Sequence, residues 1–137
     1  PQIYSMRLDD LEVERLTFEG DYNARAVLAN SGEGLIMVHR RNDIFHISYL
    51  DLARGFLRVL TDTALDESPS LSPNDSTLIY ATQVNGRGIL AGVSIDGGVR
   101  FNLPAREGDV REPAWSPKKK KIFTPIAEDL KLEAVIE

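Results

Sequence analysis

Hydrophobic and polar residues alternate along most of this chain in short runs, which polar or glycine-containing turns separate. In Val13–Leu16, for example, apolar residues at both ends enclose two charged ones. Alternating runs of about four to eight residues are typical of β-strands with one buried face. The predicted strands are 3–8, 13–16, 25–29, 35–39, 45–50, 56–60, 68–72, 77–82, 89–95 and 99–103.

One of these strand pairs recurs along the chain. The segment Asp66–Tyr80 contains a short strand, a Ser-Pro turn and a second strand, and Arg111–Pro117 restates its first half. A degraded copy lies upstream at Ala24–Gly32. Pro69 and Pro113 are about 44 residues apart, and a period of that size built of short strands indicates the blades of a β-propeller.

The predicted fold class is all-β, with three blades' worth of four-stranded antiparallel sheets and a short C-terminal helix. The expected units are an outer half-blade at 3–17, blades at 24–61 and 68–103, an inner half-blade at 110–124, and a helical tail at 125–137. We expect the innermost strands, which carry Leu28, Leu71 and Trp115, to be buried on both faces. Known propellers have about four to eight blades. The chain is therefore expected to be either part of a longer propeller or half of a six-bladed ring made by two copies.

Composition argues against two classes of function, general nucleic-acid binding and a membrane-spanning role. The chain has 137 residues, a formal net charge of −5 and no cysteine. Acidic chains lack the basic surface that general nucleic-acid binding requires, and no apolar run is long enough for a membrane-spanning helix. The chain begins at Pro1 without a signal-peptide pattern, so we expect an excerpt or a processed product.

Sequence features that resemble catalytic or ligand motifs have simpler explanations. His39 and His46 lie on adjacent predicted strands without an acid at ligand spacing, which favours a structural role over a metal site. Gly92–Gly97 nearly matches a hydrolase nucleophile elbow but lacks the strand–turn–helix context. Asn85–Gly88 indicates a hairpin turn rather than a phosphate loop. The basic run Lys118–Lys121 indicates a solvated turn rather than a site for an anionic partner. We therefore predict no catalytic residue, metal or cofactor.

The loops that enter successive innermost strands are expected to meet at one mouth of the propeller. These loops span about 17–25, 62–67 and 106–112, and they combine charged and apolar residues. Such a mixture suits protein docking, in which charge governs orientation and association rate. The predicted partner-binding residues are Thr17, Phe18, Glu19, Tyr22, Asn23, Arg25, Leu65, Asp66, Glu67, Arg106, Asp109, Arg111 and Glu112.

Several of these motifs occur together in a known family. Over residues 2–117 the chain resembles the C-terminal part of TolB-family proteins, the propeller proteins of the Tol–Pal envelope system of Gram-negative bacteria. The motifs that carry the resemblance are Arg15–Gly20, Asn23–Ala26, Leu60–Ser70, Leu78–Thr82 and Asp109–Pro117, in this order and spacing. The chain departs from the family pattern at Ala29-Asn30, where Ser-Pro is expected, and at Asn74-Asp75, where a glycine usually ends the turn.

The resemblance implies a periplasmic, non-enzymatic binding protein that acts in cell-envelope integrity. It implies a six-bladed propeller behind a smaller α/β domain, with the lipoprotein Pal, other Tol proteins and, in some species, colicins as partners. Two alternatives remain open. The chain could be a propeller excerpt that gates a serine-peptidase-like enzyme, or a half-propeller that assembles with itself for a structural purpose.

Overall fold

The computed structural model of the protein describes residues 1–105 and 107–117. Over these ranges the chain is all-β, without a helix, and its ten strands form three antiparallel sheets. The strands are β1 (Tyr4–Met6), β2 (Val13–Arg15), β3 (Asn23–Leu28), β4 (Gly34–Arg41), β5 (Ile44–Asp51), β6 (Phe56–Val59), β7 (Glu67–Leu71), β8 (Thr77–Val84), β9 (Arg87–Ser94) and β10 (Arg100–Leu103).

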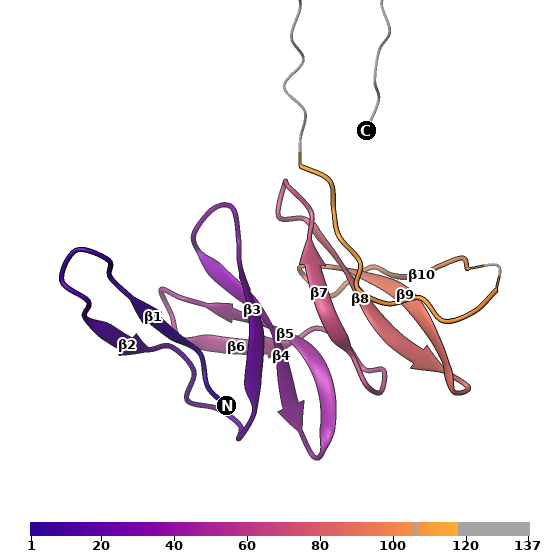
Figure 1. Cartoon of the computed structure of the whole chain (residues 1–137), viewed down its shortest axis with the longest axis horizontal. Helices are drawn as coiled ribbons and strands as arrows, with labels where there is room; N and C mark the ends of the chain where they lie inside the picture. The colour runs from indigo at the N-terminus through magenta and orange to yellow at the C-terminus, as the bar shows by residue number, and fades with distance from the viewer. Residues whose placement is uncertain (106, 118–137) are drawn as a thin grey trace, which may run out of the picture.

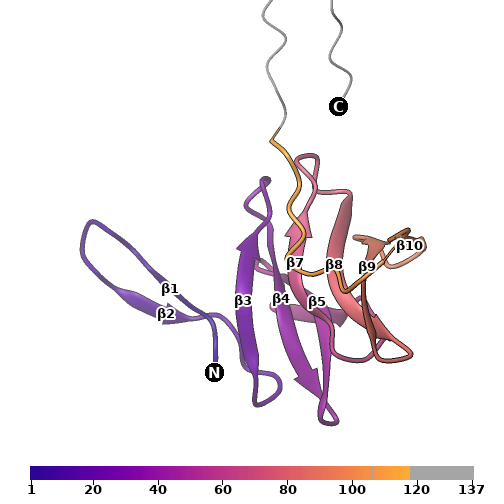
Figure 2. The ribbon, with the colours of Figure 1, turned by 45° about the vertical axis from the view of Figure 1, so that its right-hand side comes forward.

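The three sheets stand side by side as propeller blades, which confirms the fold predicted from the repeat (Figures 1 and 2). The hairpin β1–β2 lies at one end of the row, the sheet β3–β4–β5–β6 in the middle and the sheet β7–β8–β9–β10 at the other end. Strand order within each four-stranded sheet follows the sequence. The first strands of the two complete sheets, β3 and β7, contact each other.

Local sequence explains the hairpins. Asn85 and Gly86 form the two-residue turn between β8 and β9, and their φ angles of 51° and 75° are those that a tight hairpin turn requires. The hairpin predicted for this segment is therefore confirmed. At the start of each first strand the register shifts, between Ala24 and Val27 in β3 and between Glu67 and Ser70 in β7. These β-bulges bend the two strands at equivalent points.

Two apolar layers hold the sheets together. The larger one lies between the two complete sheets and includes Ile36, Ile47, Leu78 and Val93, all of which are fully buried. The smaller one joins the hairpin to the middle sheet, where Met37 and its buried neighbours contact partly buried apolar residues of the first segment. Alternation along β4 sends its odd and even residues into different layers, so that one strand serves both interfaces.

The inner half-blade predicted for 110–124 does not appear as a strand over 110–117. This segment runs beside β7 (Figure 1), where the Trp115 amide donates to Ser70 Oγ at 3.0 Å and Ser68 Oγ donates to Glu112 Oε1 at 3.0 Å. A strand needs a neighbouring strand with which to pair, and the only unfinished sheet in the described part, β1–β2, lies at the opposite end of the row. Residues 118–124, the basic run within them and the helix predicted for 125–137 lie outside the described residues.

The innermost strands are also more exposed than the sequence predicts. Leu28 is 59% exposed and Trp115 is 40% exposed, while Leu71 is partly buried against the larger core. The expectation of burial on both faces was wrong for Leu28 and Trp115. The reason is that propeller inner strands are covered by neighbouring blades on both sides, and the described part forms an open row rather than a closed ring.

Candidate functional site

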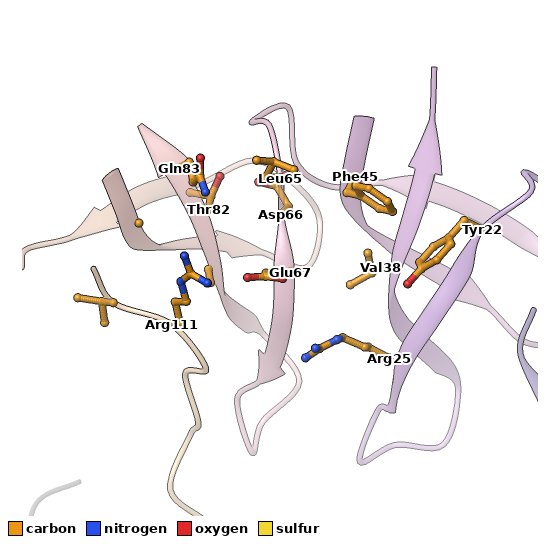
Figure 3. A pocket seen from close by; sticks show the side chains of 13 residues that line it. Tyr22, Arg25, Val38, Phe45, Leu65, Asp66, Glu67, Thr82, Gln83 and Arg111 are labelled. Atoms are coloured by element: carbon orange, nitrogen blue, oxygen red, sulfur yellow. The ribbon is translucent and has the colours of Figure 1, made fainter. Parts of the chain in front are cut away.

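A concave site opens where the starts of β3 and β7 meet the segment just before Glu112. It encloses about 320 Å³ and draws its walls from both complete sheets (Figure 3). We call this cavity the mouth. It is lined by Tyr22, Arg25, Val38, Phe45, Leu65, Asp66, Glu67, Ala81, Thr82, Gln83, Gly88, Val110 and Arg111.

Six of the predicted partner-binding residues meet at the mouth: Tyr22, Arg25, Leu65, Asp66, Glu67 and Arg111. They come from all three loops that the sequence predicts to converge. Each loop enters an equivalent point of the repeat, so neighbouring blades bring the loops to the same end of the row. The shared cavity follows from the regular spacing of the repeat.

The apolar part of the mouth contains preorganised side chains. The Tyr22 and Phe45 rings meet edge to face with their centroids 5.1 Å apart, a favourable aromatic geometry. Leu65 is 51% exposed and has a φ of 58°. Left-handed backbone is uncommon for a branched apolar residue, so the surrounding structure holds Leu65 in this conformation at the edge of the cavity.

Charged side chains surround this apolar centre. Figure 3 shows Arg25 and Arg111 on opposite sides of Glu67, which is half-buried at the start of β7. Arg25 Nη1 donates to Ser68 Oγ at 3.1 Å and lies 3.5 Å from Glu112 Oε1. The mouth therefore presents two guanidinium groups beside a carboxylate, a pattern that can recognise carboxylates of a partner.

Three of the predicted contact residues are buried instead of presented at the surface. Thr17, Asn23 and Asp66 are at most 1% exposed. The Asp66 carboxylate accepts hydrogen bonds from the hydroxyls of Thr61 and Thr63. These side chains hold the loops in place, and their polar character has a structural reason that is not visible in the sequence pattern.

Three further predicted residues in the described part, Phe18, Glu19 and Asp109, do not line the mouth. Phe18 is 75% exposed beneath the Arg15 guanidinium and, with Glu19, borders a separate hollow of about 170 Å³ near the hairpin. Asp109 Oδ1 accepts the Gly88 amide at 2.9 Å and so anchors the third loop to β9. Arg106 lies outside the described residues.

Seven residues that line the mouth were not among the predicted partner-binding residues: Val38, Phe45, Ala81, Thr82, Gln83, Gly88 and Val110. Val110 belongs to the third loop, and the other six lie on the second and third strands of a blade. Successive strands are antiparallel, so the end of a second strand lies beside the start of the first. The predicted order of the strands was therefore enough to place residues of the second strands beside the loops.

The two histidines lie side by side in the middle sheet. His39 and His46 are directly opposite each other on β4 and β5, and His39 Nδ1 is 2.8 Å from Asn23 Oδ1. Burial lowers the pKa of His39 below its ordinary value. Within residues 1–105 and 107–117, no group of three or more His, Asp or Glu residues is placed to hold a metal ion.

The near-match to a nucleophile elbow is part of a hairpin. Ser94 ends β9, its hydroxyl donates to Asp96 Oδ1, and Ser94 Oγ accepts the Val99 amide at 2.9 Å. The Gly97 φ of 79° closes the turn. These bonds engage the Ser94 hydroxyl in the turn between β9 and β10.

The family model and the most similar relatives point to the same family of proteins. The family described as "TolB beta propeller domain" matches residues 1–119. The Tol-Pal system protein TolB of Nitrosospira multiformis is 47% identical over 107 residues, which is 78% of this chain and 24% of that protein. Its counterpart from Pseudomonas aeruginosa is 52% identical over 102 residues, 73% of this chain and 24% of that protein. The chain thus spans about a quarter of the length of these relatives.

Solved structures agree on the fold. The crystal structure of TolB from Acinetobacter baumannii superposes with a TM-score of 0.80 at 45% sequence identity, over 86% of this chain and 30% of that one. A putative TolB from Agrobacterium tumefaciens, 18% identical, gives a TM-score of 0.70 over 77% and 38% of the two chains, which concerns the fold alone. A separate observation is that the described ranges hold no helix of the length and apolarity needed to cross a bilayer.

Proposed function

Because the chain belongs to the TolB beta propeller domain family, we propose that it is a non-enzymatic protein-binding module of a Tol–Pal system in the periplasm. In this proposal its mouth docks a Pal-like lipoprotein or another Tol protein and thereby supports cell-envelope integrity. The relatives that are 47% and 52% identical over the matched residues are named as Tol-Pal system proteins, which supports this assignment.

The single observation that carries the proposal is the mouth itself. It combines an ordered aromatic pair, Tyr22 and Phe45, with an exposed aliphatic side chain, Leu65, inside a ring of charged residues. Protein interfaces depend on a few apolar or aromatic anchors in concave sites, and a polar rim around them excludes water. The mouth has this composition and is accessible from solvent.

The charges indicate what the partner presents. Arg25 and Arg111 outnumber Glu67 among the accessible charged residues of the mouth, since Asp66 is buried. We therefore propose a partner surface that places an apolar side chain against Leu65 and a carboxylate near the guanidinium groups. Such charges act mainly on orientation and association rate, whereas the apolar anchor contributes most of the affinity.

The test is binding of a purified Pal-type lipoprotein domain, measured by calorimetry, to the chain and to two matched variants. Leu65→Ala is expected to weaken affinity by about 30-fold, which corresponds to about 2 kcal/mol. Leu11 is likewise more than half exposed, in the β1–β2 turn, and Leu11→Ala is expected to leave affinity unchanged. Equal affinity of the Leu65 variant and the parent chain would refute the mouth as the docking site.

A second proposal concerns the number of copies that form the binding surface. The hairpin β1–β2 provides only two strands, and Tyr4, Met6 and Val13 lie exposed on one of its faces. At the other end of the row, the segment before Pro117 occupies an inner position without strand pairing. We propose that two copies bring these ends together and close one six-bladed ring. Light scattering should then give twice 15.2 kDa, and a monomeric mass would exclude this assembly.

A further inference from the structure

Two hairpin turns occupy equivalent places in the two complete sheets and differ at one position. Asn42 and Asp43 join β4 to β5, and Asn85 and Gly86 join β8 to β9. All four residues are exposed and left-handed, with φ angles of 50° and 61° in the first turn and 51° and 75° in the second. The two turns therefore share one backbone shape, and aspartate in one stands where glycine stands in the other.

This difference matters for the chemistry of the asparagine. Asparagine is a labile residue type, because the main-chain nitrogen of the following residue can attack its side-chain amide carbon. A side chain on that following residue obstructs the attack, whereas glycine has no Cβ and allows a wide range of backbone angles. Asn85 is the only one of the six asparagines that precedes a glycine. The second turn is thus the place in the chain that is most open to deamidation.

The surroundings of Gly86 leave room for this reaction. The attack requires the Asn85 backbone to rotate out of the tight-turn conformation, so it takes place during brief local openings of the turn. Beyond the neighbouring residues, no heavy atom lies within 4 Å of the position that a Gly86 Cβ would take. At Gly20, in contrast, the His39 ring fills the corresponding position at 2.6 Å. The hairpin end can therefore open without displacing a packed side chain.

The same turn anchors the segment that carries Arg111 into the mouth. The Arg87 guanidinium donates to the Gly108 carbonyl at 3.0 Å, and the Gly88 carbonyl accepts the Val110 amide at 3.2 Å. Arg111 follows Val110 and lines the mouth, as Gly88 itself does. A change in the turn therefore acts on one wall of the mouth.

We infer that Asn85 is a modification site, at which the folded chain deamidates spontaneously and thereby loosens the segment before Arg111. In this reaction the Gly86 nitrogen forms a bond to Asn85 Cγ, the Cγ–Nδ2 bond breaks, and ammonia leaves with the proton of the Gly86 amide. Water then opens the resulting succinimide ring. Opening at Cγ gives aspartate, and opening at the main-chain carbonyl gives isoaspartate, whose backbone is longer by one methylene.

Both products add a carboxylate, and isoaspartate also alters the turn. The new charge lies two positions from Arg87 and competes with the Gly108 carbonyl for its guanidinium, since carboxylates form the stronger hydrogen bonds. The additional methylene does not fit a two-residue turn with the present pairing of Val84 and Arg87. The modification itself requires no partner, and only its effect on docking rests on the proposed function of the mouth.

The experiment is incubation of the complete chain at neutral pH in water enriched in heavy oxygen, followed by proteolysis in ordinary water and peptide mass spectrometry. We expect labelled aspartate and isoaspartate at position 85, formed several-fold faster than at Asn42. Asp43→Gly copies the second turn into the first and is expected to make Asn42 react at a comparable rate. Asn85→Gly, which suits a left-handed backbone, should abolish the reaction in the second turn.

Hydrogen exchange measured by NMR tests the link to the mouth. The isoaspartate form is separated by ion exchange, and its Val110 amide is expected to exchange about fivefold faster than in the parent chain, which is the equivalent of one lost hydrogen bond. The matched control is Asn85→Asp, which carries the new charge without the additional methylene. This variant should show a smaller increase.

Several results would overturn the inference. If position 85 acquires label in the urea-unfolded chain but not in the folded chain, the turn prevents the reaction and the site is wrong. Equal rates at Asn42 and Asn85 in the parent chain would refute the role of Gly86, and unchanged exchange of Val110 in the isoaspartate form would refute the link to Arg111. Failure of the unmodified chain to bind the lipoprotein would instead reject the proposed function and leave the modification site standing.

Discussion

Arg25 Nη1 lies 3.5 Å from Glu112 Oε1, although the two residues are 87 positions apart in the chain. Ser68 lies between them and bonds to both. The φ angles of Arg25, Ser68 and Glu112 are 54°, 52° and 53°. The repeat thus places a left-handed residue at the same point of three successive inner segments, and these points meet beside the mouth. The shared feature is a backbone bend, which three different side chains then use.

If the backbone sets this arrangement, the charge pair itself should contribute little to stability. The side chains of Arg25 and Glu112 are 55% and 70% exposed, and exposed ion pairs contribute at most about 1 kcal/mol. A double-mutant cycle with Arg25→Ala and Glu112→Ala, followed by urea denaturation, should give a coupling energy below this value. A coupling of several kcal/mol would mean that the pair organises the bend.

Much of the fold could be predicted because its signals are local. Alternation within strands and turn residues such as Asn85-Gly86 depend only on neighbouring positions, and they placed the strands of both complete sheets. The pairing state of 110–117 could not be predicted in the same way. A strand exists only beside a partner strand, and which strand lies there depends on how the row of sheets ends.

The site was predictable only in part, for a similar reason. The spacing of the repeat correctly brings Tyr22, Leu65 and Arg111 into one cavity. Asp66, however, has the same composition signal as an exposed rim acid and is fully buried. Its burial depends on the hydroxyls of Thr61 and Thr63, which the folded loop brings around it. Sequence alone shows the carboxylate but not its partners.

Gly92 in β9 should be intolerant of substitution. A Cβ at this position would lie 2.2 Å from Phe101, its cross-strand partner on β10. The aromatic ring covers the glycine, so Gly92→Ala must displace it and is expected to cost about 1–3 kcal/mol. Chemical denaturation monitored by circular dichroism provides the measurement.

The same strand offers a matched control. A Cβ at Gly88 would meet Asp109 at 3.4 Å, an ordinary contact, and its backbone is not left-handed. Gly88→Ala is therefore expected to be neutral or slightly stabilising, because alanine restricts the unfolded chain. If Gly92→Ala is as well tolerated as Gly88→Ala, the ring of Phe101 moves aside at no cost and the predicted clash is wrong.

The core between the two complete sheets should dominate stability. Leu78 is fully buried in it, and Leu78→Ala is expected to lower the free energy of unfolding by about 2–5 kcal/mol, through lost burial and a residual cavity. Val99 is 62% exposed, and Val99→Ala should change stability by less than about 0.5 kcal/mol. Urea denaturation of both variants gives the comparison. A small effect at Leu78 would mean that the two sheets do not unfold together.

Asp75 should link the two complete sheets at the end opposite the mouth. Its carboxylate accepts the Asn30 amide at 2.9 Å, the Asn30 side chain at 2.9 Å and the Ser31 amide at 2.8 Å. These bonds join the β7–β8 turn to the β3–β4 turn. Asp75→Ala is therefore expected to lower the melting temperature at pH 7, measured by circular dichroism. Asp43→Ala, in a turn within one sheet, serves as the control and should have a smaller effect.

The contribution of Asp75 should also depend on pH in a defined direction. The hydrogen bonds from the Asn30 and Ser31 backbone hold the pKa of Asp75 below its ordinary value. A depressed pKa means that the folded state favours the carboxylate, so the stabilisation is present above the unfolded-state pKa of about 3.9 and disappears as pH falls through the folded-state value. The difference in melting temperature between the parent chain and Asp75→Ala should therefore be constant from pH 7 to 5 and narrow below about pH 4. A difference that widens on acidification would show that the carboxylate is not the group that joins the two sheets.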